Sequence, residues 1–309
     1  MTTPFTAPVL RWYAQNARDL PWRQPDATPW SILVSEIMLQ QTPVSRVLPA
    51  HGAWVRRWPE AAALAAATPA DAVRQWDRLG YPRRAVRLHA SAALITTRYA
   101  GQVPASADEL RSLPGVGSYT AAAVASFAFA QRHVVLDTNV RRVLARLVTG
   151  DFLPSAGQTA AEVRLAESLL PADACLAARW SVGLMELGAL VCTSARPLCD
   201  DCPVRDQCAW LRRGRPAATS RRPPARYEGS ARQSRGRLLA VLRSANGPVS
   251  PDALDAAWLD SGQRARALAT LIDDGLVIRC ADGCLALPGE ATWPAPDDAR
   301  ERIATSRPR

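Results

Sequence analysis

Four cysteines lie close together past the middle of the chain, and they constrain its fold more than any other feature. Cys192, Cys199, Cys202 and Cys208 are separated by six, two and five residues. A cubane iron-sulfur cluster needs four thiolates that converge on one centre, and one short loop can supply them. Structural zinc is the main alternative, although only Cys199 and Cys202 form the Cys-x-x-Cys pair of a zinc ribbon. The spacing therefore favours a [4Fe-4S] cluster over zinc.

A third interpretation, four unrelated core thiols, fits the intervening residues poorly. These residues include arginines, aspartates and prolines, whereas buried cysteines usually have apolar neighbours. The remaining cysteines are Cys175, Cys280 and Cys284, and the odd total of seven argues against a secreted disulfide framework. We expect these three to be reduced thiols in a reducing compartment.

Length, charge and hydropathy narrow the classes of protein further. A chain of 309 residues can form two or three compact units. It has no apolar run of about 18 residues and no signal-like start, so we expect a cytoplasmic protein without a membrane partner. The formal charge is +10 and the pI is about 10.0, as in proteins that lie along phosphates. All 38 basic residues are arginine, so no lysine can form a Schiff base.

Apolar residues recur every three or four positions from Trp30 to about Trp210, and this period predicts an all-helical region. Strand-like alternation is hard to find there. The predicted helices cover residues 29–40, 43–57, 60–66, 69–79, 83–99, 106–112, 118–130, 137–148, 158–170 and 175–190.

The chain changes character after this helical region. Residues 212–234 combine arginine, proline and small polar residues without an apolar period, which predicts a basic flexible linker. Residues 235–290 then predict a small winged-helix-like module that could contact DNA or serve only for packing. Its expected elements are helices at 235–244, 251–258 and 263–273 and strands at 276–280 and 284–287, joined by a turn at 281–283. We expect residues 291–309 to be disordered.

A glycine-containing turn links two of the predicted helices. Gly115 and Gly117 lie in the sequence LPGVGSYT (113–120), with Val116 between them. Glycines allow a tight turn whose amides, with the N-terminus of the next helix, can face a phosphate. A plain helix connection is the alternative. An acidic motif, LDTNV (136–140), follows downstream.

These motifs together resemble MutY-type adenine DNA glycosylases of the helix-hairpin-helix superfamily with a cluster loop. The matching segments run from LPWR (20–23) to Cys208, about two thirds of the chain, and the most specific is SEIMLQQT (35–42). The sister family, endonuclease III, lacks the glutamate at position 36. The resemblance implies a mainly α fold with a six-helix barrel at 25–134, a discontinuous cluster domain at 1–24 and 135–211, and a winged-helix-like α+β module.

The resemblance implies that Glu36 and Asp137 carry out the chemistry. Breaking an N-glycosidic bond requires a proton on the departing base and stabilisation of an oxocarbenium-like sugar. Glu36 would donate the proton, and burial among apolar neighbours should raise its pKa so that it keeps this proton near neutrality. Asp137 would stabilise the sugar, transiently bonding to it, with Asn139 positioning Asp137 and water. The alternatives without a catalytic role are that Glu36 is a solvated helix residue and that Asp137 is a helix N-cap.

Tyr119 occupies the position of the Schiff-base lysine of endonuclease III-type lyases. A phenol cannot form an imine, so the resemblance implies base removal without lysine-dependent strand cleavage. Thymine-mismatch glycosylases can also carry a tyrosine here, so Tyr119 does not by itself select adenine.

Further residues are expected to contact DNA. A flipped base leaves a vacancy in the stack, and Gln41 and Tyr81 match the family's wedge positions. A buried core role is the alternative for Tyr81. Trp22, Arg23 and Glu186 should line the adenine pocket.

The module is too short and too helical to be the Nudix-like domain of full-length relatives, which helps to recognise 8-oxoguanine. The resemblance therefore implies a short, monomeric glycosylase that acts on nucleoid double-stranded DNA containing adenine opposite 8-oxoguanine or guanine. Two alternatives stay open: a thymine-mismatch or oxidised-pyrimidine glycosylase, and a cluster-bearing DNA-binding regulator without turnover.

Overall fold

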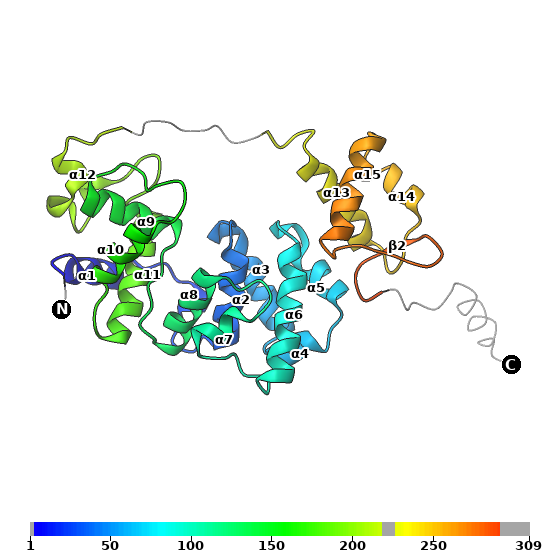
Figure 1. Ribbon diagram of the computed structural model, residues 1–309, viewed down its shortest axis with the longest axis horizontal. Helices are drawn as coiled ribbons and strands as arrows, with labels where there is room; N and C mark the ends of the chain where they lie inside the picture. The colour runs from blue at the N-terminus through cyan, green and yellow to red at the C-terminus, as the bar shows by residue number, and fades with distance from the viewer. Residues whose placement is uncertain (1–2, 218–225, 291–309) are drawn as a thin grey trace. The chain divides into compact units, whose positions relative to one another are not determined.

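The computed structural model describes residues 3–217 and 226–290, which are mainly helical (Figure 1). They divide into two compact units. One unit contains the chain up to Gly52 and the segment that starts at Gln102; the other contains Ala53–Gly101 and residues 226–290, which we call the C-terminal module. These units do not coincide with the domains expected from the family resemblance, whose bounds stay a prediction.

The first unit carries nine of the labelled helices, and α3 crosses into the second. Its helices are α1 (Thr6–Asn16), α2 (Pro29–Leu39), α3 (Val44–Arg57), α7 (Ala107–Arg111), α8 (Ser118–Phe129), α9 (Thr138–Leu144), α10 (Ala160–Leu169), α11 (Ala174–Leu190) and α12 (Ala209–Arg212). Shorter helical turns lie at Pro21–Arg23, Ala145–Thr149, Cys199–Asp201 and Arg205–Gln207.

The second unit combines short helices with a small hairpin. Its elements are α4 (Ala61–Ala65), α5 (Pro69–Trp76), a 3-10 turn at Asp77–Leu79, α6 (Arg83–Arg98), α13 (Ala231–Ser244), α14 (Pro251–Asp255), α15 (Ser261–Asp273), β1 (Ile278–Arg279) and β2 (Leu285–Ala286). The two strands are antiparallel, with Ile278 opposite Ala286. An isolated antiparallel bridge joins Val249 to Leu285.

Each unit has an apolar core. In the first, α1, α9 and α11 pack together around buried Val9, Val140 and Trp180. The four-cysteine segment covers this core, and Cys208 is part of it. In the second, Trp54 lies edge-on to both Trp58 and Trp76, at centroid distances of 4.7 and 5.5 Å. In such edge-to-face contacts the positive edge of one ring faces the negative face of the other, which stabilises the packing of the helices that carry these rings.

The structure confirms the predicted helices, with shifted ends. The expected helix 137–148 is shorter, since α9 ends at Leu144 and a π-helical turn follows. Helix α1 was not predicted, and only two of its residues, Thr6 and Val9, are buried. The segment 231–234 was expected to be linker, but α13 begins at Ala231, where the Ser230 side chain accepts a hydrogen bond from the Gln233 amide. Residues 218–225 of the expected linker and the expected tail lie outside the described residues.

The predicted hairpin in the C-terminal module is confirmed. Within the described ranges, no helix combines the length and apolar character needed to cross a membrane.

Candidate active site

Glu36 lies on α2 and is almost fully buried, with 4% of its surface exposed. The Thr28 side chain caps the start of α2 and Pro29 opens it, so the helix begins one turn before a run of apolar residues. The pKa of Glu36 is raised to about 7: burial is the largest cause and the Asp137 charge adds to it, while Arg23 and a hydrogen bond with Tyr119 act in the opposite direction. A carboxylic acid with this pKa can hold a proton at neutral pH and release it during a reaction.

The Tyr119 phenol lies against this carboxyl group at the start of α8. It shares a side-chain hydrogen bond with Glu36, and burial together with the Glu36 and Asp137 charges raises the pKa of Tyr119 well above its usual value. Tyr119 is therefore a neutral phenol that orients Glu36.

Asp137 precedes α9 and is its N-cap. One carboxylate oxygen accepts the Val140 amide at 2.6 Å, and the other accepts Asn139 Nδ2 at 2.8 Å. Burial raises the pKa of Asp137, whereas these donors and the Arg142 charge lower it. The N-cap role expected as the alternative for Asp137 is therefore confirmed, and its charged role stays a prediction.

The two carboxyl groups have different surroundings. Burial is the largest influence at both groups and raises both pKa values, to about 7 at Glu36; at Asp137, hydrogen bonds from Val140 and Asn139 oppose this rise. Two carboxyl groups in unequal surroundings can supply one acid and one anion at the same pH.

Hydrogen bonds connect Asp137 to the four-cysteine segment. Arg142 Nη2 donates to Asn139 Oδ1 at 2.7 Å and to the Gly188 carbonyl at 2.6 Å, and its Nε donates to the Cys192 carbonyl at 2.8 Å. A Cβ at Gly188 would lie 2.7 Å from Asn139 Cβ, so only glycine permits this approach of α11 to α9. Asn139 therefore contacts Asp137 and is itself held by Arg142, a residue with no predicted role.

Glu186 is completely buried on α11, where Arg18 and Arg23 bind it. Arg18 donates through Nε at 2.5 Å and through Nη2 at 3.0 Å. These hydrogen bonds and charges lower the pKa of Glu186 despite its burial. Glu186 is therefore a fixed anion that anchors Arg23. The Arg23 charge in turn lowers the pKa of Glu36.

Trp22 is buried next to Arg23, and its ring lies edge-on to His51 at 5.0 Å. Burial lowers the pKa of His51, so this imidazole is neutral at pH 7, and its Nε2 lies 3.0 Å from the Ser31 carbonyl. The ring of Trp22 is thereby held in one orientation.

The glycine turn has the geometry expected of a phosphate-facing hairpin. Gly115 has a φ of 84°, and the Val116 amide donates to the Leu113 carbonyl at 3.1 Å. Gly117 is the N-cap of α8 and no side chain caps that helix, which leaves its first amides to an external acceptor. Gln40 Nε2, at the end of α2, donates to the Gly115 carbonyl at 3.3 Å.

The two expected wedge residues are exposed and share an unusual backbone. Gln41 has a φ of 55° and Tyr81 a φ of 49°, values that non-glycine residues rarely adopt. Tyr81 is 49% exposed, so the alternative of a buried core tyrosine is wrong.

The four cysteines of the loop are all free thiols. Burial is the largest cause of the raised pKa of Cys202, about 12. Arg146 contacts two of the sulfurs: its Nη1 donates to Cys192 Sγ at 3.4 Å, and its carbonyl accepts from Cys208 Sγ at 3.5 Å. Within residues 3–217 and 226–290, no group of three or more metal-binding side chains is close enough to hold a single ion.

Several residues of the site carry no sequence signal that identifies them. Arg18 and Arg142 become functional only through contacts with residues 168 and 50 positions away. Gln40 is adjacent to the expected Gln41, and their shared motif could have indicated it.

Comparisons with known proteins agree with this geometry. A family model described as "HhH-GPD superfamily base excision DNA repair protein" matches residues 34–167. The solved structure of a thermostable thymine-DNA glycosylase is similar, with a TM-score of 0.61 and 27% identity, and the match covers 68% of this chain and 95% of that one. The predicted helix-hairpin-helix glycosylase fold is therefore confirmed.

Curated relatives extend the match beyond this fold. An adenine DNA glycosylase of Homo sapiens is 40% identical over 215 residues, which cover 67% of this chain and 39% of the human protein. An adenine DNA glycosylase of Mycolicibacterium smegmatis is 51% identical over 283 residues, which cover 91% of this chain and 95% of the relative. The chain therefore belongs to the adenine DNA glycosylase family.

Proposed function

We propose that this protein removes adenine from double-stranded DNA where adenine lies opposite 8-oxoguanine or guanine, as part of base excision repair in the cytoplasm. The observation that carries the proposal is the buried Glu36, whose pKa is about 7, next to the hydrogen-bonded Asp137. Family membership supports adenine as the base.

The proposed reaction divides between the two carboxyl groups. Glu36 donates its proton to a ring nitrogen of adenine as the N-glycosidic bond breaks and its electron pair leaves with the base. The Asp137 carboxylate stabilises the positive charge on the sugar, by proximity or by a transient bond to its anomeric carbon. A water molecule, positioned with Asn139, then adds its oxygen to this carbon, any bond from Asp137 to the carbon breaks with its electron pair returning to the Asp137 carboxylate, and the water gives its proton to the Glu36 carboxylate.

The same site argues against a lyase step. The chain contains no lysine, and Tyr119 is a neutral phenol in hydrogen-bond contact with Glu36. Without an amine near the sugar, no imine forms to cleave the strand. We therefore propose a monofunctional glycosylase that works as a monomer.

Cys192, Cys199, Cys202 and Cys208 would hold a [4Fe-4S] cluster, which shapes the loop that packs on the core and binds Arg142. Four cysteines within one short loop, with Arg146 in contact with the sulfurs of Cys192 and Cys208, support this group. Iron and zinc content of the purified protein tests this: about four irons per chain are expected, and stoichiometric zinc would support the alternative site.

Single-turnover base release tests the proposed function. The substrate is a duplex with adenine opposite 8-oxoguanine, and the parent is compared with Glu36→Gln and with the surface control Glu167→Gln. Release by the parent and the control, a loss of at least about 100-fold in Glu36→Gln, and intact strands before alkali are expected.

A thymine-mismatch activity is the second candidate, because the similar solved structure is a thymine-DNA glycosylase and Tyr119 fits both reactions. A duplex with thymine opposite guanine distinguishes the two. Thymine release without adenine release would replace the proposal, and binding without any release would favour the regulator.

A further inference from the structure

Residues 77–83, which we call the Tyr81 loop, have a strained backbone that their own sequence does not explain. Asp77 and Tyr81 have positive φ values of 42° and 49°, and Gly80 between them has 94°. Non-glycine residues rarely adopt such conformations, which persist only where surrounding contacts impose them.

Local contacts fix the middle of the loop. Trp76 Nε1 and Arg84 Nη2 both donate to the Gly80 carbonyl, at 2.9 Å each. The Arg84 guanidinium also lies over the rings of Trp76 and Tyr81, at 5.0 and 5.4 Å. Arg84 is therefore a support beneath the exposed Tyr81.

The C-terminal module holds both ends of the loop. Arg243 on α13 donates to the Asp77 carbonyl, the first residue of the loop. Asp274, which follows α15, accepts Arg83 Nη1 at 3.1 Å and Arg235 Nη2 at 2.5 Å. These contacts join residues 166 and 191 positions apart in the sequence.

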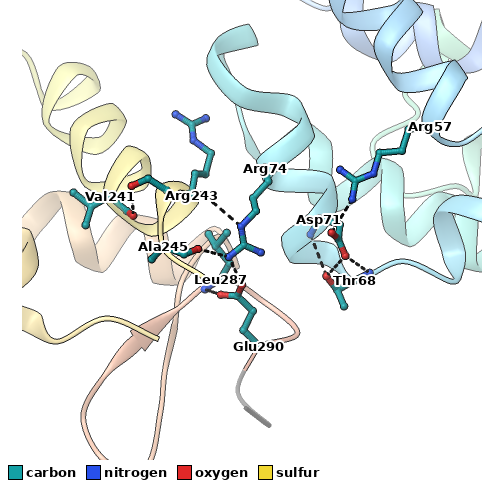
Figure 2. A network of polar contacts seen from close by, with 10 residues as sticks. Arg57, Thr68, Asp71, Arg74, Val241, Arg243, Ala245, Leu287 and Glu290 are labelled. Atoms are coloured by element: carbon teal, nitrogen blue, oxygen red, sulfur yellow. Dashed lines mark hydrogen bonds and ion pairs between the residues drawn. The ribbon is translucent and has the colours of Figure 1, made fainter. Parts of the chain in front are cut away.

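A further arginine fastens the module beside the loop. Arg74, on α5, donates to the carbonyls of Arg243 and Ala245, at 3.4 and 2.8 Å, and binds the Glu290 carboxylate (Figure 2). Glu290 also accepts the Leu287 amide at 3.0 Å. A Cβ at Gly289 would lie 3.0 Å from Pro69, so the chain end of the module is close against the start of α5.

The charge of the module argues against a separate DNA-binding role. Residues 226–290 contain eight arginines and eight acidic residues, whereas the whole chain carries +10. Residues 250–274, which form α14 and α15, contain two arginines and five aspartates. A recognition helix that enters a groove needs a basic surface, and this pair of helices is acidic.

We propose that the C-terminal module is a brace for the Tyr81 loop, with Arg243 and Asp274 as positioning residues that hold Tyr81 exposed for insertion into the base stack. The inference rests on the proposed function, because it assumes that Tyr81 props the duplex while a base is flipped. It gives the module a role in base flipping in place of one in DNA reading.

A double-mutant cycle tests the brace. Single-turnover adenine release is measured for the full-length, metal-loaded parent, Arg243→Met, Tyr81→Ala and the double variant. We expect Tyr81→Ala and Arg243→Met each to lower the rate about ten-fold or somewhat less. The double variant should lose no more than Tyr81→Ala, because both act through the same side chain. Arg243→Lys, which keeps a donor for Asp77, should recover part of the rate.

The control is Arg264→Met, which removes an arginine of similar burial from the module's own ion pair with Asp255, at 2.8 Å. It should leave the rate unchanged. Multiplicative losses in the Arg243→Met and Tyr81→Ala double variant, or an unchanged rate in Arg243→Met, would overturn the inference.

Amide hydrogen exchange separates failure of the brace from failure of the proposed function. Exchange over residues 77–83 should be faster in Arg243→Met and in Asp274→Asn than in the parent, whatever base the enzyme removes. If the parent releases no adenine but this difference is seen, only the proposed function is wrong. If exchange does not change, the brace is wrong.

Discussion

The Glu36 carboxyl group and the Tyr81 loop are both held in unfavourable states, but by different means. Burial raises the pKa of Glu36 and favours its neutral form, against the opposing effects of Arg23 and of the hydrogen bond with Tyr119. The strained Tyr81 loop is held by Arg243 and Asp274, which lie far along the chain. In the proposed function, the acid therefore depends on burial within one unit, and the position of Tyr81 depends on tertiary contacts in the other.

Asp137→Asn should have the largest effect and tests the catalytic side of this comparison. Asparagine is as good an N-cap as aspartate, so α9 and the stability of the protein should be retained. The charge that stabilises the sugar is lost, and single-turnover release should fall about 100- to 1,000-fold.

The matched control is Asp173→Asn, because Asp173 caps α11 by accepting the Leu176 amide at 2.7 Å. It should retain both stability and rate. A rate loss in Asp137→Asn that merely follows a loss of folded protein would reduce Asp137 to a structural cap.

Glu36→Gln should stabilise the protein in a pH-dependent way. The pKa of Glu36 rises from 4.5 to about 7 on folding, so its contribution to stability is present below pH 4.5 and is lost as the pH rises through 7. Relative to the parent, Glu36→Gln should gain about 3 kcal/mol between pH 4.5 and pH 8. Denaturant unfolding at both pH values measures this gain; an equal difference at the two would show that Glu36 is ionised in the folded protein.

Gly115→Ala and Gly117→Ala should differ, although both change the hairpin. Gly115 has a φ of 84°, so alanine there should cost about 1 kcal/mol and weaken DNA binding. Gly117 has an ordinary φ of −89° and open space around its Cβ position, so alanine there should be nearly neutral for stability. Denaturation midpoints of the two variants check the contrast, and equal costs would contradict it.

Asp77→Gly should have the smallest effect, and of opposite sign. Its φ of 42° and ψ of −124° suit glycine, so the substitution should relieve strain and stabilise the protein by up to about 1 kcal/mol. Asp77→Asn is the control, since it removes the same charge near Arg243 without freeing the backbone. If both variants behave alike, the loop is not strained at Asp77.

The sequence was sufficient to predict features whose cause is local. The helical region, the glycine hairpin and the burial of Glu36 follow from apolar period, glycine position and neighbours within a few residues. The cysteine spacing predicts its cluster for the same reason, and that prediction awaits measurement.

Features that depend on distant contacts could not be predicted from the sequence. Nothing in the sequence around Asp77 or Tyr81 indicates a positive φ, and the contacts of Arg243 and Asp274 with the two ends of the loop come from far along the chain. In the same way, the residues next to Arg142 in the sequence do not indicate that it links Asn139 to the Cys192 carbonyl through hydrogen bonds. Helix α1 was likewise not predicted, and its packing against the core through Val9 is a tertiary contact.

The pH dependence of single-turnover adenine release most directly tests the central claim, that burial keeps Glu36 protonated as the acid. The duplex carries adenine opposite 8-oxoguanine, enzyme is in excess over substrate at saturation, and the rate is followed from pH 5.5 to 9. The account predicts a rate that falls with rising pH through a midpoint near 7, as Glu36 loses its proton, and no such midpoint in the residual rate of Glu36→Gln. A parent rate that stays constant to pH 9, or the same midpoint in Glu36→Gln, would contradict it.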